Sequence, residues 1–326
     1  MEYVNFGQAG VKVSRLAFGL GLRGVGDPDA AERLIEHAIE CGINFIDCAN
    51  VYGLNDDASL HAGTSEQILA RVLKRHRDDL FISSKVFSRT GPGPNDAGSS
   101  RYHIMREIDR TLARLETDHI DVYILHGYDQ TTPLEETLRA LDDLVRAGKT
   151  RYVGVSNFQA WQVVKALWTQ ASAGLDALIC IQNPYNLLNR DLEREMWPAQ
   201  RDQGFGAMTY SPLGVGLLSG IYVPGQAAPP GSLYATVRAT NLEKEMNATA
   251  GATLELLKEI AAAHGKTVAQ TALNWVLSHP EVSTAITGAD TIEHMDENVG
   301  AVGWAISAQD RERLDEVSSG GNRVLD

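Results

Sequence analysis

The feature that most constrains the fold is an alternation of short apolar runs with longer amphipathic segments, repeated along the whole chain. The runs are rich in β-branched residues and apolar at both odd and even positions, which is typical of parallel strands covered on both faces. We identify eight runs, at residues 16–21, 43–49, 80–86, 120–126, 152–156, 177–182, 206–210 and 283–288. Eight strand–helix units predict an α/β fold, a closed (β/α)₈ TIM barrel, and we expect residues 1–326 to form one such domain.

Two segments stand outside this repeat. Residues 3–6 and 11–14 flank a Gly-Gln-Ala-Gly turn and predict an N-terminal β-hairpin. Residues 307–317 predict an extra C-terminal helix, with Ser307 as its N-cap. The stretches 87–100 and 219–247 follow predicted strands and are expected to be long loops at the face where barrels place their sites.

Helix starts are marked by side chains that can accept a hydrogen bond from the first backbone N–H groups. Asp27 before Pro28 predicts an N-cap followed by a proline in the first turn. The capping-box spacing, a short polar side chain three residues before Glu or Gln, occurs at four further places. These are Thr132/Glu135, Thr64/Gln67, Thr267/Gln270 and Asp290/Glu293.

Composition narrows the range of functions. The net charge of −13 disfavours nucleic acids and anionic membranes as partners, because their phosphates would be repelled. No run of apolar residues is long enough to span a membrane, and the first residues lack the apolar core of a secretory signal. Cys41, Cys48 and Cys180 fit neither a disulfide framework nor a zinc spacing. We therefore expect a cytoplasmic enzyme without a metal site.

Polar side chains occur at the ends of successive predicted strands. Asp47 lies near the end of the second run, Lys85 lies near the end of the third and His126 ends the fourth, while Tyr52 follows Asp47 by five residues. Catalytic groups of barrel enzymes gather at the carboxyl ends of strands, so these four side chains are expected to converge. A lysine at the end of an apolar strand needs a charge partner, and Asp47 on the neighbouring strand can provide it.

This set of residues suits proton transfer by a tyrosine. A free phenol has a pKa of about 10, which is high for a group that must exchange protons near neutral pH. A nearby lysine ammonium lowers the pKa of the phenol, and a carboxylate keeps that lysine charged. A histidine beside them can donate a hydrogen bond to a substrate carbonyl. Taken one at a time, the same residues would fit a buried ion pair, a packed aromatic ring or a core histidine.

Several motifs in order along the chain resemble the aldo-keto reductase family: 47–53 (DCANVYG), Lys85, His126 after DVYIL, 154–158 (GVSNF), Gln182-Asn183, 210–218 (YSPLGVGLL) and Glu297-Asn298. The resemblance implies NAD(P)H-dependent reduction of aldehydes or ketones on a metal-free (β/α)₈ barrel. It implies that Tyr52 is the general acid, that Lys85 lowers its pKa, that Asp47 supports Lys85 and that His126 orients the carbonyl.

The resemblance also implies which residues bind the nicotinamide cofactor. Ser156, Asn157 and Gln182 would bind the carboxamide, Tyr210 would stack on the nicotinamide ring, and the 211–218 segment would follow the pyrophosphate. The full set is Gly21, Leu22, Asp47, Ser156, Asn157, Gln182, Tyr210, Ser211, Pro212, Leu213, Gly214, Gly216, Leu218, Gly288, Asp290, His294, Glu297 and Asn298.

The sequence leaves the choice between NADP(H) and NAD(H) open. The family habit favours NADP(H), but Gly288, Asp290 and His294 stand where NADP(H)-binding relatives place arginine or lysine. Loss of cations weakens binding of a 2′-phosphate, although Arg238 in the 219–247 stretch is available as a charge. We expect NADP(H), with a preference that is relaxed or shifted toward NAD(H).

Three other interpretations account for parts of the sequence. Residues 19–24 spell GxGxxG, as in a Rossmann fold, but eight strand–helix units exceed what that fold predicts. A Schiff-base aldolase would use Lys85 as its nucleophile. A cofactor-sensing regulatory subunit would keep the barrel and the cofactor site. The partner is expected to be a small carbonyl compound, with Val86, Phe87 and Tyr128 near it; its identity, the oligomeric state and the reaction direction stay open.

Overall fold

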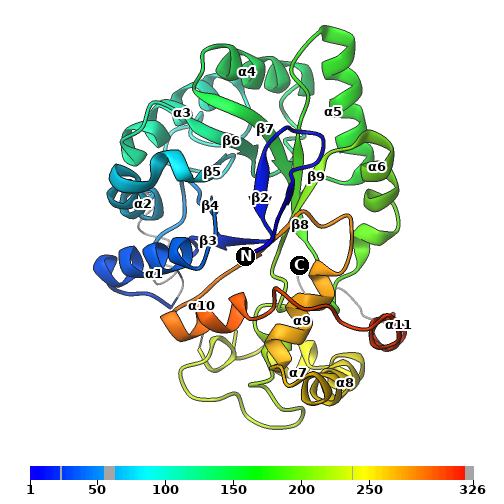
Figure 1. Ribbon diagram of the computed structural model, residues 1–326. Helices are drawn as coiled ribbons and strands as arrows, with labels where there is room; N and C mark the ends of the chain where they lie inside the picture. Colours follow the sequence, from blue (N-terminus) through cyan, green and yellow to red (C-terminus); the bar gives the residue numbers. More distant parts are fainter. Residues whose placement is uncertain (23, 55–62, 237, 320–326) are drawn as a thin grey trace.

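The computed structural model describes residues 1–22, 24–54, 63–236 and 238–319, so Arg23 of the 19–24 motif lies outside it. Eight parallel strands close into a barrel in the order β10-β3-β4-β5-β6-β7-β8-β9 (Figure 1). Their bounds are β3 Leu16–Gly19, β4 Phe45–Asp47, β5 Phe81–Val86, β6 Ile120–Leu125, β7 Thr150–Ser156, β8 Cys180–Pro184, β9 Gly206–Tyr210 and β10 Thr284–Thr287. The predicted (β/α)₈ barrel is confirmed, and a closed barrel leaves no place for the open sheet of a Rossmann fold.

Helices surround the barrel and cover the outer faces of its strands (Figure 1). The α-helices are α1 Pro28–Glu40, α2 Thr64–His76, α3 Arg101–Leu115, α4 Leu134–Arg146, α5 Ala160–Ala173, α6 Met196–Gln203, α7 Leu242–Glu245, α8 Ala248–His264, α9 Val268–Leu277, α10 Ile292–Val299 and α11 Ala308–Val317. Short 3₁₀ turns are η2 Arg77–Asp79, η3 Asp191–Glu193, η4 Leu217–Ser219 and η5 Leu233–Ala235. Within the described residues, no helix is both long and apolar enough to cross a membrane.

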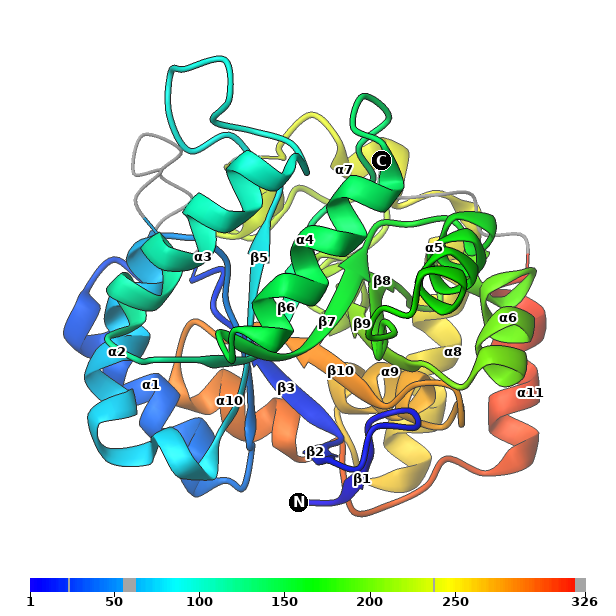
Figure 2. The same ribbon diagram turned by 90° about the horizontal axis from the view of Figure 1, so that it is seen from above.

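The N-terminal hairpin closes one end of the barrel. Strands β1 (Tyr3–Asn5) and β2 (Lys12–Ser14) pair antiparallel, as the sequence predicts. Phe6, next to β1, packs edge-to-face against Phe45 and Phe81 inside the barrel, with ring centroids 5.6 and 5.8 Å apart. Figure 2 shows the hairpin at the opposite end of the molecule from the loops that follow β5 and β9. An open site is therefore restricted to the carboxyl ends of the strands.

Helix caps agree with the sequence at some positions and not at others. Asp27 caps α1, Ser307 caps α11 and the Thr267/Gln270 capping box is present. The other three capping boxes are wrong. Helix α2 starts at Thr64 after Gly63, Pro133 holds the N-cap position of α4, and Thr291 rather than Asp290 caps α10. Thr132 instead donates to Asp129 in its own loop, and Asp290 accepts from the backbone of Gly24, so neither side chain caps the helix that follows.

The connection from β9 to β10 is more helical than expected. The 219–247 stretch, predicted to be irregular, contains η5 and α7, and two helices (α8 and α9) rather than one complete this unit. Tyr234 donates a hydrogen bond to Glu245, and Arg238 Nη2 lies 2.6 Å from the other oxygen of that buried carboxylate. This polar cluster orders a segment whose proline and glycine content predicts a loop.

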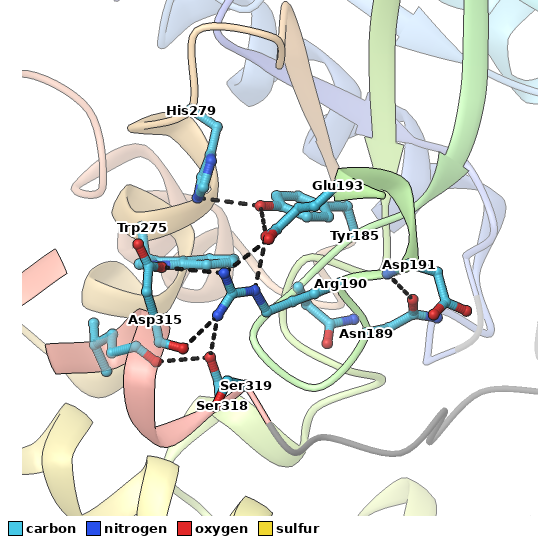
Figure 3. A network of polar contacts seen from close by, with 12 residues as sticks. Tyr185, Asn189, Arg190, Asp191, Glu193, Trp275, His279, Asp315, Ser318 and Ser319 are labelled. Atoms are coloured by element: carbon cyan, nitrogen blue, oxygen red, sulfur yellow. Dashed lines mark hydrogen bonds and ion pairs between the residues drawn. The ribbon is translucent and has the colours of Figure 1, made fainter. Parts of the chain in front are cut away.

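A polar network anchors the exit of β8 to the C-terminal helix (Figure 3). Arg190 binds both carboxylate oxygens of Glu193, at 2.7 and 2.8 Å, and reaches the carbonyl of Asp315 on α11 at 2.6 Å. Tyr185, the residue after β8, donates to Glu193 at 2.7 Å and lies 3.1 Å from His279 Nε2. The network holds the β8 exit against α9 and α11.

Candidate active site

A buried ion pair joins the ends of β4 and β5. Lys85 Nζ lies 2.8 Å from Asp47 Oδ2 and donates to the carbonyl of Cys48 at 2.8 Å. The two side chains are only 0% and 4% exposed. The other oxygen of Asp47 accepts from Ser83 Oγ at 2.5 Å and from Gln182 Nε2 at 3.0 Å. Buried charges are stable only when paired and hydrogen-bonded, and both of these are.

The ion pair keeps Lys85 positively charged. Burial of the ammonium lowers its pKa, but the charges of Asp47 and of an ionised Tyr52 raise it by more, so the pKa of Lys85 is raised overall. The interaction is reciprocal: a phenolate that stabilises the ammonium is stabilised by it. The barrel therefore holds a fixed positive charge next to the ring of Tyr52.

Tyr52 is positioned by the turn after β4. Its backbone N–H donates to the carbonyl of Ala49, and its own carbonyl accepts from Ser65 in the first turn of α2. Lys85 Nζ lies 4.4 Å from the centre of the Tyr52 ring, and the Tyr52 hydroxyl lies 3.4 Å from His126 Nε2. The structure thus brings together the four side chains that the sequence singled out.

His126 is held as a neutral imidazole. Burial, and next the charge of Lys85, lower the pKa of His126 to about 3. Its backbone N–H donates to the carbonyl of Val86, which sets the residue directly beyond β6. His126 Nδ1 is buried and has no hydrogen-bond partner among the residues that the structure describes. A neutral histidine facing Tyr52 can donate one hydrogen bond to an oxygen placed between them.

A second group of polar side chains lies at the ends of β7, β8 and β9. Tyr210 donates to Asn157 Oδ1 at 2.8 Å, and Asn157 Nδ2 donates to the carbonyl of His126 at 2.9 Å. Ser156 Oγ donates to the carbonyl of Gln182 at 2.8 Å. Burial, and next the charge of Tyr52, raise the pKa of Tyr210 to about 12, so this phenol stays protonated. Through Asn157, these bonds connect two of the predicted cofactor residues to the backbone of His126.

Asn183, beside Gln182 on β8, is absent from the sequence-based set of binding residues. Its Nδ2 donates to the carbonyl of Phe158 at 3.2 Å. Its Oδ1 is buried and finds no hydrogen-bond partner within the described part of the chain. Buried polar atoms of native proteins are almost always paired, so an unpaired one at a strand end marks a place where a ligand can bond. Its position one residue after Gln182 was the available sequence signal.

Backbone strain gathers at the same end of the barrel. Leu22 after β3, Asn157 after β7, and Ser211 and Val215 after β9 have φ angles of 46°, 61°, 51° and 54°. Non-glycine residues rarely occupy this left-handed region, and a β-branched valine does so least readily. Such strain is concentrated at functional sites. The 211–218 segment is therefore not an ordinary tight turn, and Gly214 and Gly216 share its positive φ.

The predicted adenosine-end residues lie at the seam between the first and last barrel strands. Asp290 accepts a hydrogen bond from the backbone of Gly24 at 3.1 Å, and Asn298 Nδ2 donates to the carbonyl of Gly288 at 2.9 Å. His294 is exposed in the first turn of α10 and Glu297 is half-buried. A Cβ at Gly24 would lie 2.3 Å from the Asp290 carboxyl carbon, so a larger residue there would require the exposed Asp290 side chain to move.

The predicted substrate-side residues differ in accessibility. Val86 is fully buried in the core, whereas the half-buried ring of Phe87 packs against Gly127. Tyr128 packs edge-to-face on Phe158, with centroids 5.1 Å apart, and lies 6.0 Å from the ring of Trp161. Trp161 is 52% exposed and was not predicted from the sequence.

Asp129, a further residue that sequence reasoning missed, fixes the loop after β6. It accepts hydrogen bonds from the hydroxyls of Thr131 and Thr132 and from the backbone of Ser99. Burial raises the pKa of Asp129, but these hydrogen bonds together hold it well below its usual range. The ionised carboxylate ties two loops of the carboxyl face together. An aspartate two residues before threonine is a recognised turn pattern and was the signal available.

Fold and site together define a barrel enzyme with a tyrosine, a charged lysine and a neutral histidine at its open mouth. The sequence profile of the aldo/keto reductase family matches residues 15–319, so the chain belongs to this family and is an oxidoreductase. It is 35% identical to the uncharacterized oxidoreductase YrpG of Bacillus subtilis, over 98% of this chain and 97% of that protein.

Two further relatives carry more specific names. The chain is 36% identical to a probable voltage-gated potassium channel subunit beta of Arabidopsis thaliana, over 93% of this chain and 91% of that protein. It is 31% identical to an L-glyceraldehyde 3-phosphate reductase of Escherichia coli, over 93% of this chain and 88% of that protein. The family of this chain thus includes proteins named for carbonyl reduction and proteins named as channel subunits.

Proposed function

We propose that this protein uses a reduced nicotinamide nucleotide to convert a small aldehyde or ketone into an alcohol. One observation carries the proposal: the hydroxyl of Tyr52 lies beside a neutral His126, and its ring lies beside the buried Lys85–Asp47 pair. An aromatic acid with a fixed cation next to it and a neutral donor facing it is suited to protonating a carbonyl oxygen. The E. coli relative, named as a reductase, supports the same class of reaction.

Each residue of the group has a distinct part in proton transfer. Tyr52 gives its proton to the carbonyl oxygen, and His126 donates a hydrogen bond that places that oxygen. The Lys85 ammonium stabilises the phenolate left behind, and Asp47 holds the ammonium in place. The bound cofactor supplies the hydride. Acid catalysis by a positioned side chain typically contributes roughly 10²–10⁴-fold to the rate.

The residues present fit a nicotinamide carboxamide. This group needs one hydrogen-bond acceptor and one donor from the protein, and Asn183 Oδ1 is a buried acceptor without a partner in the described residues. We propose that Asn183 joins Ser156, Asn157 and Gln182 in holding the carboxamide. Tyr210, protonated and bonded to Asn157, would present its flat ring to the nicotinamide.

We propose a relaxed choice between NADP(H) and NAD(H). The cation nominated from the sequence, Arg238, is bonded to Glu245 at 2.6 Å and is therefore engaged by its own loop. Asp290 adds negative charge near the seam, where a 2′-phosphate would need positive charge. The dissociation constants of NADPH and NADH should then lie within about tenfold of each other, a difference of about 1.4 kcal/mol. A much stronger preference for NADPH would remove this part of the proposal.

The proposed reaction is tested by NADPH oxidation with 4-nitrobenzaldehyde. We expect turnover by the wild type and a fall in kcat of about 10²–10⁴-fold in Tyr52→Phe, because only the acidic proton is removed. Tyr102→Phe, at a tyrosine that is 63% exposed on α3, is the matched control and should retain full activity. Equal rates in wild type and Tyr52→Phe would refute the role given to Tyr52.

A cofactor-sensing subunit is the second candidate, favoured by the relative named as a channel subunit. In that case the protein would bind the nucleotide tightly but turn over no carbonyl compound at a useful rate, and the same assay distinguishes the two. The aldolase alternative is disfavoured because a Schiff base needs a neutral amine and the pKa of Lys85 is raised: burial lowers this pKa, but Asp47 and Tyr52 together raise it by more. Borohydride should therefore trap no substrate on Lys85.

A further inference from the structure

Three metal-ligating side chains meet on the outside of the barrel, away from the carboxyl face. His37 lies in the last turn of α1, Cys41 is the C-cap of that helix, and Asp296 lies on α10. His37 Nε2 lies 2.6 Å from Asp296 Oδ1 and 3.6 Å from Cys41 Sγ, and Cys41 Sγ lies 4.0 Å from Asp296 Oδ1. The thiol of Cys41 is free and half-buried. We refer to His37, Cys41 and Asp296 as the seam cluster.

The spacing of the seam cluster is close to that of a tetrahedral zinc site. With Zn–S of about 2.3 Å and Zn–N or Zn–O of about 2.0–2.1 Å, ligand atoms lie about 3.3–3.6 Å from one another. The observed sulfur–nitrogen distance of 3.6 Å already meets this value. To reach this spacing, Asp296 Oδ1 must move by about half an ångström or more, away from His37 Nε2 and toward Cys41 Sγ. Asp296 can move in this way, because its side chain is 58% exposed.

The donor types also favour zinc over the harder cations. A thiolate and an imidazole suit Zn²⁺, whereas Mg²⁺ and Ca²⁺ select oxygen ligands almost exclusively. A second carboxylate, Glu40, places Oε2 3.8 Å from the other ring nitrogen of His37. In zinc sites a carboxylate in this place accepts the N–H of the ligating histidine and fixes its orientation. The remaining coordination position would be open to water.

The seam cluster joins two elements that are far apart in the sequence. Helix α1 follows the first barrel strand and α10 follows the last, and the two helices pack side by side (Figure 1). Helix α10 also carries His294, Glu297 and Asn298, which are expected at the adenosine end of the cofactor. We propose that the seam cluster is a binding site for a zinc-like divalent cation, which ties α1 to α10 where the barrel closes.

This proposal departs from the expectation of a metal-free chain, which rested on spacing within the sequence. His37 and Cys41 are four residues apart, but Asp296 is contributed from 255 residues further along. Such a site is visible only once the barrel is closed. The zinc proposal does not depend on the reaction proposed for the mouth of the barrel, because the seam cluster shares no residue with the set of Asp47, Tyr52, Lys85 and His126.

The site is tested with Co²⁺ as a spectroscopic probe on the whole chain after dialysis against a chelator. We expect one equivalent of Co²⁺ to produce a thiolate-to-cobalt charge-transfer band that Zn²⁺ abolishes by competition. Cys41→Ser should eliminate the band, and His37→Ala should weaken binding at least tenfold, as for loss of a ligand. The two remaining thiols, Cys48 and Cys180, are completely buried and cannot substitute.

The matched control is another histidine–carboxylate pair that lacks a thiol. His119 Nδ1 lies 2.6 Å from Asp118 Oδ1, as close as the nitrogen and oxygen of the seam cluster. His119→Ala should leave the cobalt band unchanged. Zinc should also raise the Tm of the wild type by about 2 °C or more, and of Cys41→Ser by less. The absence of a band in the wild type, or a band that persists in Cys41→Ser, would overturn the proposal.

Discussion

Two polar clusters of this barrel, one half-buried around Arg190 and one fully buried around Lys85, differ in how completely their polar atoms are hydrogen-bonded. Around Arg190, all three guanidinium nitrogens have partners, two on Glu193 and one on the backbone of α11. At the mouth, Lys85 and Asp47 are equally well paired, but His126 Nδ1 and Asn183 Oδ1 lack partners among the described residues. In the first cluster every guanidinium nitrogen has a hydrogen-bond partner, whereas the second cluster contains two buried atoms that can still bond a ligand.

The two clusters also differ in backbone conformation. The left-handed Asn157 directly follows β7 and bonds to the carbonyl of His126, and the left-handed Ser211 and Val215 lie in the loop after β9. Non-glycine strain of this kind costs of order 1–3 kcal/mol per residue and persists only where the surroundings enforce it. In this barrel, a polar cluster whose hydrogen bonds are all made therefore indicates a structural role. A cluster with unpaired buried atoms and a strained backbone indicates a functional role.

The largest effect is expected from breaking the charge pair at the mouth. Lys85→Met should lower kcat/KM by about 10²–10⁴-fold and should also destabilise the fold by about 3–5 kcal/mol, because Asp47 is left as an unpaired buried charge. The double variant Lys85→Met/Asp47→Asn should regain most of the stability and none of the activity. Steady-state kinetics and urea unfolding of all three variants measure both effects. Recovery of activity in the double variant would contradict the role of the ammonium.

A smaller effect is expected from a substitution in the cluster around Arg190. Arg190→Met removes the guanidinium that pairs with Glu193, which keeps its hydrogen bond from Tyr185, and should lower the free energy of unfolding by about 1–3 kcal/mol. The turnover rate per folded molecule should stay that of the wild type, because Arg190 bonds to Glu193, Asp315 and Ser318 and not to Tyr52, Lys85 or His126. Urea unfolding followed by an activity assay checks the prediction. A variant that is stable but slow would place the network within the catalytic machinery.

A third effect is expected in the pH dependence of stability, where it develops gradually with acidification. Burial, followed by a nearby positive charge, lowers the pKa of His126 to about 3 and of His279 to about 4. Below about pH 6.5 the unfolded chain binds a proton at each position that the folded chain does not, so stability is complete above this pH. It falls toward pH 4 by up to about 1.4 kcal/mol per pH unit for each group.

Glutamine substitutions at His126 and at His279 test the roles of the two clusters separately. His126→Gln and His279→Gln should each flatten the loss of stability between pH 6.5 and 4, as followed by urea unfolding, since the titrating group is gone. Only His126→Gln should also lower kcat/KM at pH 7. If His279→Gln were the variant that lost activity, the division between the two clusters would be wrong.

The fold was predictable because the strand pattern is strong. Eight apolar runs suffice to define the barrel, and the strand bounds differ from prediction mainly at the ends, as at 43–49, where only Phe45–Asp47 pairs as a strand. Capping was predicted less well: Thr132 bonds to Asp129 within its own loop, and Asp290 bonds to the backbone of Gly24 in a loop 266 residues away. Local spacing cannot reveal a competing partner that arrives from another part of the chain.

The site was predictable where residues sit on strands and much less so elsewhere. Asp47, Lys85 and His126 lie at or next to strand ends, so adjacency in the sheet places them together. Ser83 was missed, although it lies two residues before Lys85 and therefore on the same face of β5. The seam cluster was beyond sequence reasoning, because one of its three members comes from the opposite end of the chain.

The claim at the centre of this account is that the Lys85 ammonium makes the phenol of Tyr52 acidic. An ultraviolet difference titration of tyrosine ionisation measures this directly, with Tyr52→Phe identifying the signal. We expect an ionisation in the wild type that is missing from Tyr52→Phe and that moves to higher pH in Lys85→Met/Asp47→Asn, where the fold is kept and the cation is lost. A Tyr52 signal at the same pH with and without the ammonium would contradict the account.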